Sequence, residues 1–204
     1  MKVSVIIPAY NQDELIKRCL DSIPKRKDVE IIVVNDGSTD KTKDVLEEYK
    51  KNIYSDLVII SYSENKGVSV ARNKGMRKAQ GEYIVFIDSD DYIYPDVFND
   101  IVDHDLGLVD LVFYNMIDNN NHKYEVNRRS IMGRVGMFKF IKKSFIGTTR
   151  FAKGIQYGED AIFHEKLIAK MPCFKCTDKL MYHYNYPREG SLTNLYQKGN
   201  KKWN

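Results

Sequence analysis

The stretch EYIVFIDSDDYIY, residues 82–94, decides how the rest of the chain is interpreted. Its apolar part, YIVFI, is typical of a strand buried on both faces of a parallel sheet. The strand ends in Asp88, Ser89, Asp90 and Asp91, where three carboxylates within four residues repel one another unless a cation lies close by. Such oxygen ligands favour Mg²⁺ or Mn²⁺ completed by phosphate and water. The stretch predicts a metal site at a strand end; the alternative is a solvated turn that caps the next helix.

Strand-like and helix-like segments alternate through the first half of the chain. Three further apolar runs, at residues 3–7, 30–34 and 57–61, have the same character as YIVFI. Amphipathic helix patterns separate them, and we expect Asn11 to cap the first helix, with Glu14 completing a capping box. The alternation predicts an α/β fold with a Rossmann-like, mostly parallel sheet flanked by helices.

The second half has a less regular pattern. We expect strands at residues 109–115 and 179–186, a polar turn at 118–122, a loop at 147–158, and helices at 136–145 and 159–169. Cys173 and Cys176 form a CxxC pair, but a zinc site needs four ligands and a redox pair belongs at a helix start. Buried or half-buried thiols are therefore expected.

The composition describes a globular chain. Its 204 residues are 43% hydrophobic and 29% charged, and a net charge of +4 does not argue for nucleic acid. No apolar run approaches the ~20 residues of a membrane helix, and the run at 3–7 is too short for a signal peptide. Three cysteines favour a reducing compartment. We expect a cytoplasmic protein without a transmembrane segment, and the basic C-terminus leaves peripheral contact with a membrane open.

Polar clusters follow three of the predicted strands: PAYN at residues 8–11, NDGS at 35–38 and DSD at 88–90. The ligand crevice of an open α/β sheet lies beyond the carboxyl ends of its strands, so the three clusters predict one site. Asp36 is expected to accept a hydrogen bond from the imide N–H of a base, to form a tight turn, or both.

Two further segments carry charged residues at predicted helix starts. Arg72 lies near the start of the third helix pattern, where a guanidinium faces either phosphates or a surface ion-pair partner. Glu159 and Asp160 open the helix at 159–169, and an acidic pair there is common for helix-dipole reasons alone. Neither segment by itself identifies a reaction.

Five segments resemble, in order, the motifs of family 2 glycosyltransferases of the GT-A fold. They are SVIIPAYNQDELIKRCLDSI, EIIVVNDGSTDKT, NKGVSVARNKG, GEYIVFIDSDD and YGEDAIF. The resemblance is specific to about residue 105, and the late Tyr-rich segment YHYNYPREGSLTN extends it. It implies one transferase domain over 1–204, with a nucleotide-sugar-binding half (1–105) and an acceptor-binding half (106–204). The implied reaction is the inverting transfer of one sugar, from a UDP-sugar, to a hydroxyl of a glycan, lipid-linked or other glycoconjugate acceptor.

The resemblance also implies residue roles. The implied donor-binding residues are Pro8, Ala9, Tyr10, Asn11, Asp36, Ser38, Lys66, Arg72, Asp88 and Ser89. Asp36 would hold the uracil, Arg72 would approach the base or diphosphate, and Asp88 would bind the ribose side. Asp90 would ligate Mn²⁺ or Mg²⁺, and Asp160 would be the catalytic base. Asp91 would be a helix-side support rather than a ligand, so Asp91→Ala should be much milder than Asp90→Ala.

Several interpretations stay open. His183 is either an extra metal ligand, a phosphate contact or a half-buried strand histidine. The presumed acceptor region is basic, which fits an anionic acceptor or a solvated face equally; its cations are Arg128, Arg129, Arg134, Lys142, Lys143 and Arg150. From another class, a catalytically idle nucleotide-sugar-binding module is the alternative. A haloacid-dehalogenase-type phosphatase is disfavoured, because Tyr92 stands where that pattern has Thr or Val.

Overall fold

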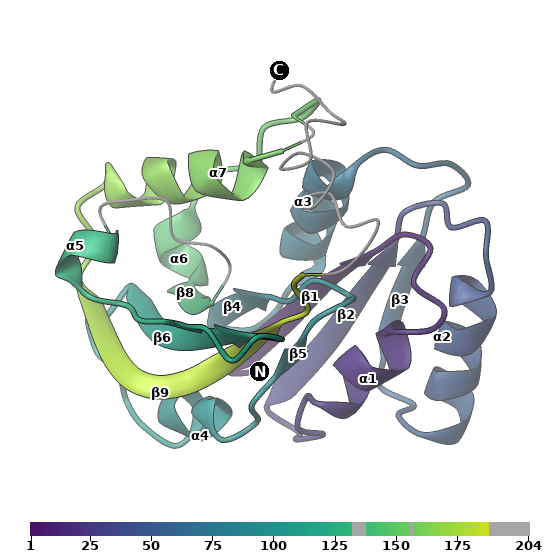
Figure 1. The fold of residues 1–204 in the computed structure, drawn as a ribbon, viewed down its shortest axis with the longest axis horizontal. Coiled ribbons are helices and arrows are strands. Elements are labelled where there is room, and N and C mark those ends of the chain that lie inside the picture. The colour runs from purple at the N-terminus through teal and green to yellow at the C-terminus, as the bar shows by residue number, and fades with distance from the viewer. Residues whose placement is uncertain (132–137, 156, 188–204) are drawn as a thin grey trace.

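The computed structural model describes residues 1–131, 138–155 and 157–187 (Figure 1). Several predicted features lie outside these residues: the start of the helix predicted at 136–145, Arg134, and the Arg and Ser of the late segment, Arg188 and Ser191. The basic C-terminus also lies outside them. None of the described helices is both long and apolar enough to cross a membrane.

The first half forms the parallel part of the sheet. Strands β1 (Val3–Ala9), β2 (Val29–Asn35), β3 (Val58–Ser61) and β4 (Tyr83–Phe86) lie in the order β3-β2-β1-β4, and every pair in this series is parallel. All residues of β1, β2 and β4 are buried. The continuous apolar runs therefore formed central strands, as predicted, and their carboxyl ends meet at one edge.

Helices cover both faces of this sheet. They are α1 (Ile16–Asp21), α2 (Thr42–Asn52), α3 (Val68–Lys78) and α4 (Val97–Val102). Figure 1 shows α3 and α7 above the sheet and α1, α2 and α4 below it. Helix α3 packs very closely on β1, because a Cβ on Gly75 would come within 2.3 Å of the Ile6 side chain.

The predicted cap of the first helix is wrong. Helix α1 begins at Ile16, with no side-chain capping bond, and Asn11 lies in a left-handed conformation at φ 53°. The Oδ1 atom of Asn11 instead accepts a hydrogen bond from the backbone N–H of Thr39, at 2.8 Å. Asn11 thus joins the loop after β1 to the loop after β2, and a capping-box pattern cannot reveal such a distant partner.

The second half extends the sheet with mixed pairing. Beyond β4 the order is β8-β6-β9-β5, and the added elements are β5 (Tyr92–Ile93), β6 (Leu111–Asp118), β7 (Lys123–Tyr124), β8 (Lys139–Lys142) and β9 (Phe174–Tyr184). Strands β8 and β5 run antiparallel to their neighbours, whereas β6 and β9 are parallel. Short helices α5 (Arg128–Ile131) and α6 (Lys143–Ile146) and the longer α7 (Glu159–Ile168) complete this half.

Two predictions for this half are wrong. The segment predicted as a helix at 136–145 forms strand β8 and the short helix α6, because Phe140 and Ile141 pair with Val112 of β6 and Ile84 of β4. Strand β9 begins at Phe174 rather than at residue 179. A third prediction, that Cys173 and Cys176 are buried or half-buried, is also wrong, because both are exposed.

Candidate active site

The loop after β4 separates its three aspartates by burial. Asp88 and Asp90 are half-buried, while Ser89 and Asp91 are buried. A carboxylate must be accessible to bind a metal ion that also contacts a ligand, so Asp88 and Asp90 fit this task and Asp91 does not. Within the described residues, no group of three or more His, Cys, Asp or Glu side chains is arranged to hold an ion. The two accessible carboxylates, Asp88 and Asp90, would suit a Mg²⁺ or Mn²⁺ ion whose other ligands come from phosphate and water.

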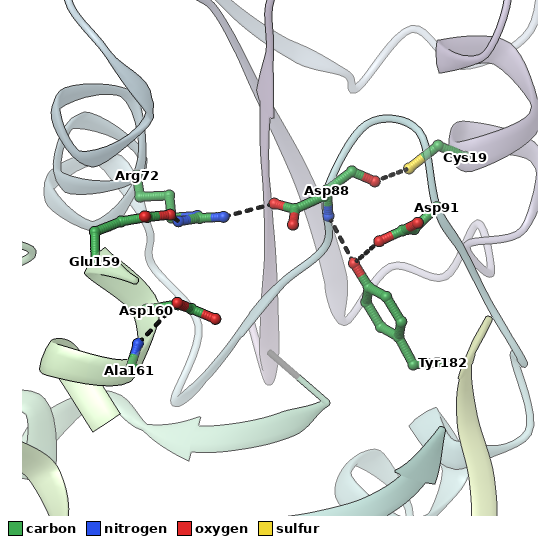
Figure 2. A network of polar contacts seen from close by, with 8 residues as sticks. All are labelled: Cys19, Arg72, Asp88, Asp91, Glu159, Asp160, Ala161 and Tyr182. Atoms are coloured by element: carbon green, nitrogen blue, oxygen red, sulfur yellow. Dashed lines mark hydrogen bonds and ion pairs between the residues drawn. The ribbon is translucent and has the colours of Figure 1, made fainter. Parts of the chain in front are cut away.

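A buried guanidinium joins this loop to two helices (Figure 2). Arg72 of α3 donates from Nη2 to Oδ1 of Asp88, at 2.7 Å, and from Nη1 to Oε1 of Glu159 on α7, at 2.6 Å. Its side chain is 3% exposed. Burial acts to lower the pKa of Arg72, but the negative charges of Asp88 and Glu159 outweigh burial and raise it. The pair of bonds keeps Arg72 charged and fixes α3, α7 and the loop relative to one another.

The two acidic residues that open α7, Glu159 and Asp160, lie in different environments. Gly158 precedes the helix in a left-handed conformation, at φ 79°. Glu159 is buried against Arg72, and its pKa is raised first by burial and also by the charge of Asp160. Asp160 is half-buried, and its Oδ1 accepts a hydrogen bond from the N–H of Ala161, at 2.8 Å. Figure 2 shows Asp160 beside the Arg72–Glu159 pair, so the two ends of the predicted site do come together.

On the other side of the loop, Tyr182 of β9 contacts Asp91. Its hydroxyl donates to Oδ2 of Asp91, at 2.6 Å, and accepts from the backbone N–H of Asp88, at 3.0 Å (Figure 2). The N–H of Asn185 donates to the other oxygen of Asp91, at 2.7 Å. Burial, followed by the charges of Asp90 and Asp88, raises the pKa of Asp91 well above its usual value. Asp91 thus supports the loop from inside the protein through Tyr182 of β9 and the Asn185 backbone, whereas a support on the helix side was predicted.

The loops after β1 and β2 are fastened to each other. Besides the Asn11 bond to Thr39, the hydroxyl of Ser38 accepts a hydrogen bond from the N–H of Asn11, at 3.0 Å. Pro8 and Ala9 are buried within β1, whereas Tyr10 is 44% exposed at its end. Tyr10 is therefore the accessible aromatic residue directly after β1, while its predicted neighbours shape the loop that carries it.

Asp36 connects the loop after β2 to the start of α3. Its two carboxylate oxygens accept hydrogen bonds from the N–H groups of Lys66 and Gly67, at 2.9 and 2.8 Å. Gly37 next to it has φ +69°, and a Cβ there would lie 2.3 Å from the backbone of Glu64. Lys66 is exposed, with its ammonium 5.0 Å from the centre of the Tyr62 ring. Asp36 thus organises the segment that carries Lys66, and only lone pairs left by these bonds are available to a base.

His183 lies in a different cluster from the accessible aspartates. Its ring stacks on Tyr92 with centroids 4.3 Å apart, and its Nε2 lies 3.0 Å from Oδ1 of Asn119. The guanidinium of Arg18 lies over the same Tyr92 ring, at 5.2 Å. Burial, and then the charge of Arg18, lowers the pKa of His183. These contacts match the strand-histidine interpretation better than that of a metal ligand.

Three of the six basic residues expected near an acceptor are bound to backbone carbonyls. Lys142 donates to the carbonyl of Gly107, at 2.7 Å, Lys143 to that of Ala79, at 2.6 Å, and Arg150 to those of Gly147 and Thr149, each at 2.7 Å. These cations stabilise turns and segment ends.

Sequence patterns missed two residues of the site, Tyr182 and Lys139, and the pairing role of Glu159. Tyr182 and the pairing role of Glu159 depend on contacts between distant segments, although the Tyr-rich strand and the Glu-Asp motif pointed to the right regions. Lys139 of β8 is 2% exposed, and burial lowers its pKa to about 8, opposed by the negative charge of Asp160. Its ammonium lies 5.8 Å from the centre of the Phe113 ring. A lysine inside an apolar run was the available signal.

The chain belongs to glycosyl transferase family 2, whose model matches residues 4–171. It is 33% identical over 210 aligned residues to a poly(ribitol-phosphate) beta-glucosyltransferase of Bacillus spizizenii, which covers 93% of this chain. The chain spans only 33% of that relative's length.

Solved structures identify the fold as GT-A. S. aureus TarS 1-349 in complex with UDP-GlcNAc superimposes with a TM-score of 0.81 and 28% identity, over 95% of this chain and 61% of that chain. A mannosyltransferase of Pyrobaculum calidifontis, in complex with GDP-Man and Mn²⁺, shares the fold, with a TM-score of 0.72 and 19% identity over 93% of this chain and 58% of its own.

Proposed function

We propose that this chain is the catalytic core of an inverting glycosyltransferase that moves one sugar from a UDP-sugar to an acceptor hydroxyl. The observation that carries the proposal is the Arg72 junction, which bonds to Asp88 and to Glu159, the neighbour of Asp160. It brings the helix start that carries a general-base candidate next to one accessible strand-end carboxylate, although they lie far apart in the sequence. The donor complex of TarS supports UDP-sugar as the donor class.

The chain's own residues suit the steps of such a transfer. Asp160 is half-buried, and within the part of the chain that the structure describes its carboxylate accepts a hydrogen bond from the neighbouring Ala161 N–H, so it can take the proton of an attacking hydroxyl. Attack on the anomeric carbon from the face opposite the nucleotide inverts that centre in one displacement. Arg72 holds the Asp88 carboxylate in place next to the donor side, and the exposed ring of Tyr10 offers a surface for the base.

Asp90, with Asp88, would hold Mn²⁺ or Mg²⁺. When bound there, the ion supplies positive charge that neutralises the leaving nucleoside diphosphate. The loop presents these two carboxylates and keeps Asp91 buried, which prevents a third negative charge from crowding the diphosphate. The same proposal includes a single transferase domain over residues 1–204. It also includes that this domain meets membrane-linked acceptors at the cytoplasmic face.

We further propose a polyol-phosphate polymer as the acceptor. The Bacillus spizizenii relative is a glucosyltransferase of poly(ribitol-phosphate), and it aligns with 93% of this chain. Such a polymer offers many hydroxyls between phosphates, which suits an enzyme that adds single sugars. Its anionic character also agrees with the basic composition of the second half.

The test is transfer by the purified chain with a panel of UDP-sugars, Mn²⁺ and poly(ribitol phosphate), followed by UDP release and product mass. Asp160→Asn should lose about 10²–10⁴-fold in turnover, the usual contribution of a general base. Asp90→Ala should lose the metal-dependent activity. Asp56→Asn removes an exposed charge just before β3 and should leave turnover unchanged.

The outcomes separate the enzyme from the alternative of an idle binding module. Tight UDP-sugar binding with no transfer to any acceptor would favour the binding module. Transfer to neutral glycans but not to the phosphate polymer would overturn the acceptor class while keeping the enzyme class.

A further inference from the structure

The hydroxyl of Tyr182 lies at a junction that the transfer reaction does not itself require. It donates to the Asp91 carboxylate at 2.6 Å and accepts from the Asp88 backbone N–H at 3.0 Å. Tyr182 is 3% exposed and Asp91 is 2% exposed. One hydroxyl therefore bonds to both ends of the loop that carries the two accessible carboxylates (Figure 2).

The same segment of β9 is fastened to this region at further points. The N–H of Asn185 donates to Asp91, at 2.7 Å, and the N–H of Tyr94 donates to the carbonyl of Met181, at 2.8 Å. Strand β5, directly after the loop, pairs with β9 through Tyr92 and His183. Backbone bonds thus align the two segments, but only a side chain reaches back to Asp88.

A purely structural tyrosine does not explain this arrangement well. A buried carboxylate is costly unless its oxygens are hydrogen-bonded, and an apolar pair at these positions would fill the core at lower cost. What the polar pair adds is a defined backbone geometry, because the Asp88 N–H is held in place. This geometry decides where the carboxylates of Asp88 and Asp90 lie.

We propose that Tyr182 is a positioning residue for the Asp88 and Asp90 carboxylates. Its hydroxyl holds residues 88–91 in the conformation that turns those two carboxylates toward the crevice and keeps Asp91 inside. The proposal rests on the proposed function for its consequence, which is tighter binding of a Mn²⁺–nucleotide. Because Tyr182 belongs to the second half of the chain, the donor site is complete only when β9 is docked.

The test compares Tyr182→Phe with Tyr83→Phe. Tyr83 is also fully buried, and its hydroxyl donates to the carbonyl of Val109, at 2.8 Å, away from the loop. Both variants lose one buried hydroxyl, but only Tyr182→Phe frees the Asp88 N–H. Two readouts follow: hydrogen exchange of a peptide covering residues 86–92, and calorimetric titration with Mn²⁺ and UDP.

Tyr182→Phe should exchange faster over residues 86–92 and bind Mn²⁺–UDP about tenfold more weakly, the effect of one well-placed hydrogen bond. Tyr83→Phe should match the wild type in both. In transfer assays the loss should appear mainly in the KM for the donor and in the Mn²⁺ requirement, rather than in kcat. If the two variants are alike in exchange and in binding, Tyr182 is only a core residue and the proposal fails.

A second variant tests the same proposal if Tyr182→Phe folds poorly. In Tyr182→Phe/Asp91→Leu both polar partners are replaced by apolar groups, which avoids a buried unsatisfied carboxylate. It should fold and still bind Mn²⁺–UDP weakly; wild-type affinity would overturn the proposal. If the wild type itself binds no Mn²⁺–UDP, the proposed function fails, and the exchange comparison still decides the role of Tyr182.

Discussion

The two sides of the loop at residues 88–91 are held by different chemistry. On one side, two carboxylates meet the buried guanidinium of Arg72, at 2.6 and 2.7 Å. On the other side, one buried carboxylate meets the neutral hydroxyl of Tyr182 and a backbone N–H. Ion pairs with Arg72 hold the side of the loop that faces α3 and α7. Hydrogen bonds from two uncharged donors, the Tyr182 hydroxyl and the Asn185 N–H, hold the side that faces β9. The stability of the first side should depend on the Arg72 charge, and that of the second side on the hydrogen bonds of Asp91.

The largest effect should come from removing the guanidinium. Arg72→Met leaves Glu159 buried without its cation, and such a loss costs about 3–5 kcal/mol. Urea unfolding should show this decrease in the free energy of unfolding. Arg72→Lys keeps a charge but cannot form both bonds in the same geometry. Its free energy of unfolding should therefore lie between those of the wild type and Arg72→Met. A decrease below about 1 kcal/mol for Arg72→Met would contradict a charge-dependent junction.

A smaller effect on stability is expected on the neutral side. Asp91→Ala leaves the Tyr182 hydroxyl and the Asn185 N–H without their acceptor, which should cost about 1–3 kcal/mol. Asp90→Ala should cost little stability but remove metal-dependent turnover, whereas Asp91→Ala should retain part of it. Measuring the free energy of unfolding and UDP release for both variants tests whether one variant mainly loses turnover and the other mainly loses stability. Equal loss of turnover would mean that Asp91 is more than a support.

The charged side also carries a pH-sensitive residue. His164 follows Asp160 by one turn of α7, and burial, with Lys139, lowers its pKa from 6.5 to about 4. Between these values the unfolded chain binds more protons than the folded chain, so stability is lost as the pH falls from about 6.5 toward 4. From about pH 7 to about pH 5 the loss should be about 2 kcal/mol.

His164→Gln checks this prediction because it cannot titrate and keeps a side-chain N–H for the Ile131 carbonyl, which lies 2.8 Å from Nε2. Its urea unfolding curves at the two pH values should differ less than those of the wild type. If both proteins lose the same stability, the acid sensitivity has another source, and the charged side is no more pH-dependent than the neutral one.

The smallest effect should come from an exposed charge cluster. Arg26 bonds to Asp28 at 3.0 Å and to Asp103 at 2.8 Å, with side chains that are about a third to a half exposed. Exposed ion pairs contribute about 0–1 kcal/mol and weaken with salt. Arg26→Ala should therefore change unfolding by less than 1 kcal/mol, less still at high salt. If Arg26→Ala lowers the free energy of unfolding as much as Arg72→Met does, burial does not determine how much these ion pairs contribute to stability.

The parallel half of the fold was predictable because its signal is local. A strand buried on both faces needs a continuous apolar run, and β1, β2, β3 and β4 each appeared within two residues of the predicted bounds. Parallel strands end at one edge, so the grouping of the strand-end clusters followed as well. The family resemblance placed Asp160 with them, and the bonds of Arg72 give that placement a physical basis.

The mixed half was not predictable in the same way. Residues 139–142 are Lys, Phe, Ile and Lys, a pattern too short to distinguish a helix from a strand, and the free edges of β4 and β6 decided the outcome. Asn11 has the residues of a capping box around it, yet its partner is Thr39 of another loop. In both cases a contact between distant segments outweighed a local preference.

The sequence by itself determined that three aspartates follow a central strand, beside other polar strand ends, in a chain of this family. Only the tertiary structure decided how those aspartates differ. Asp88 meets Arg72, Asp91 is buried beneath Tyr182, and Asp90 stays accessible between them. Neighbours in sequence share a composition but not an environment, because burial and hydrogen bonding depend on which distant strand or helix covers each residue.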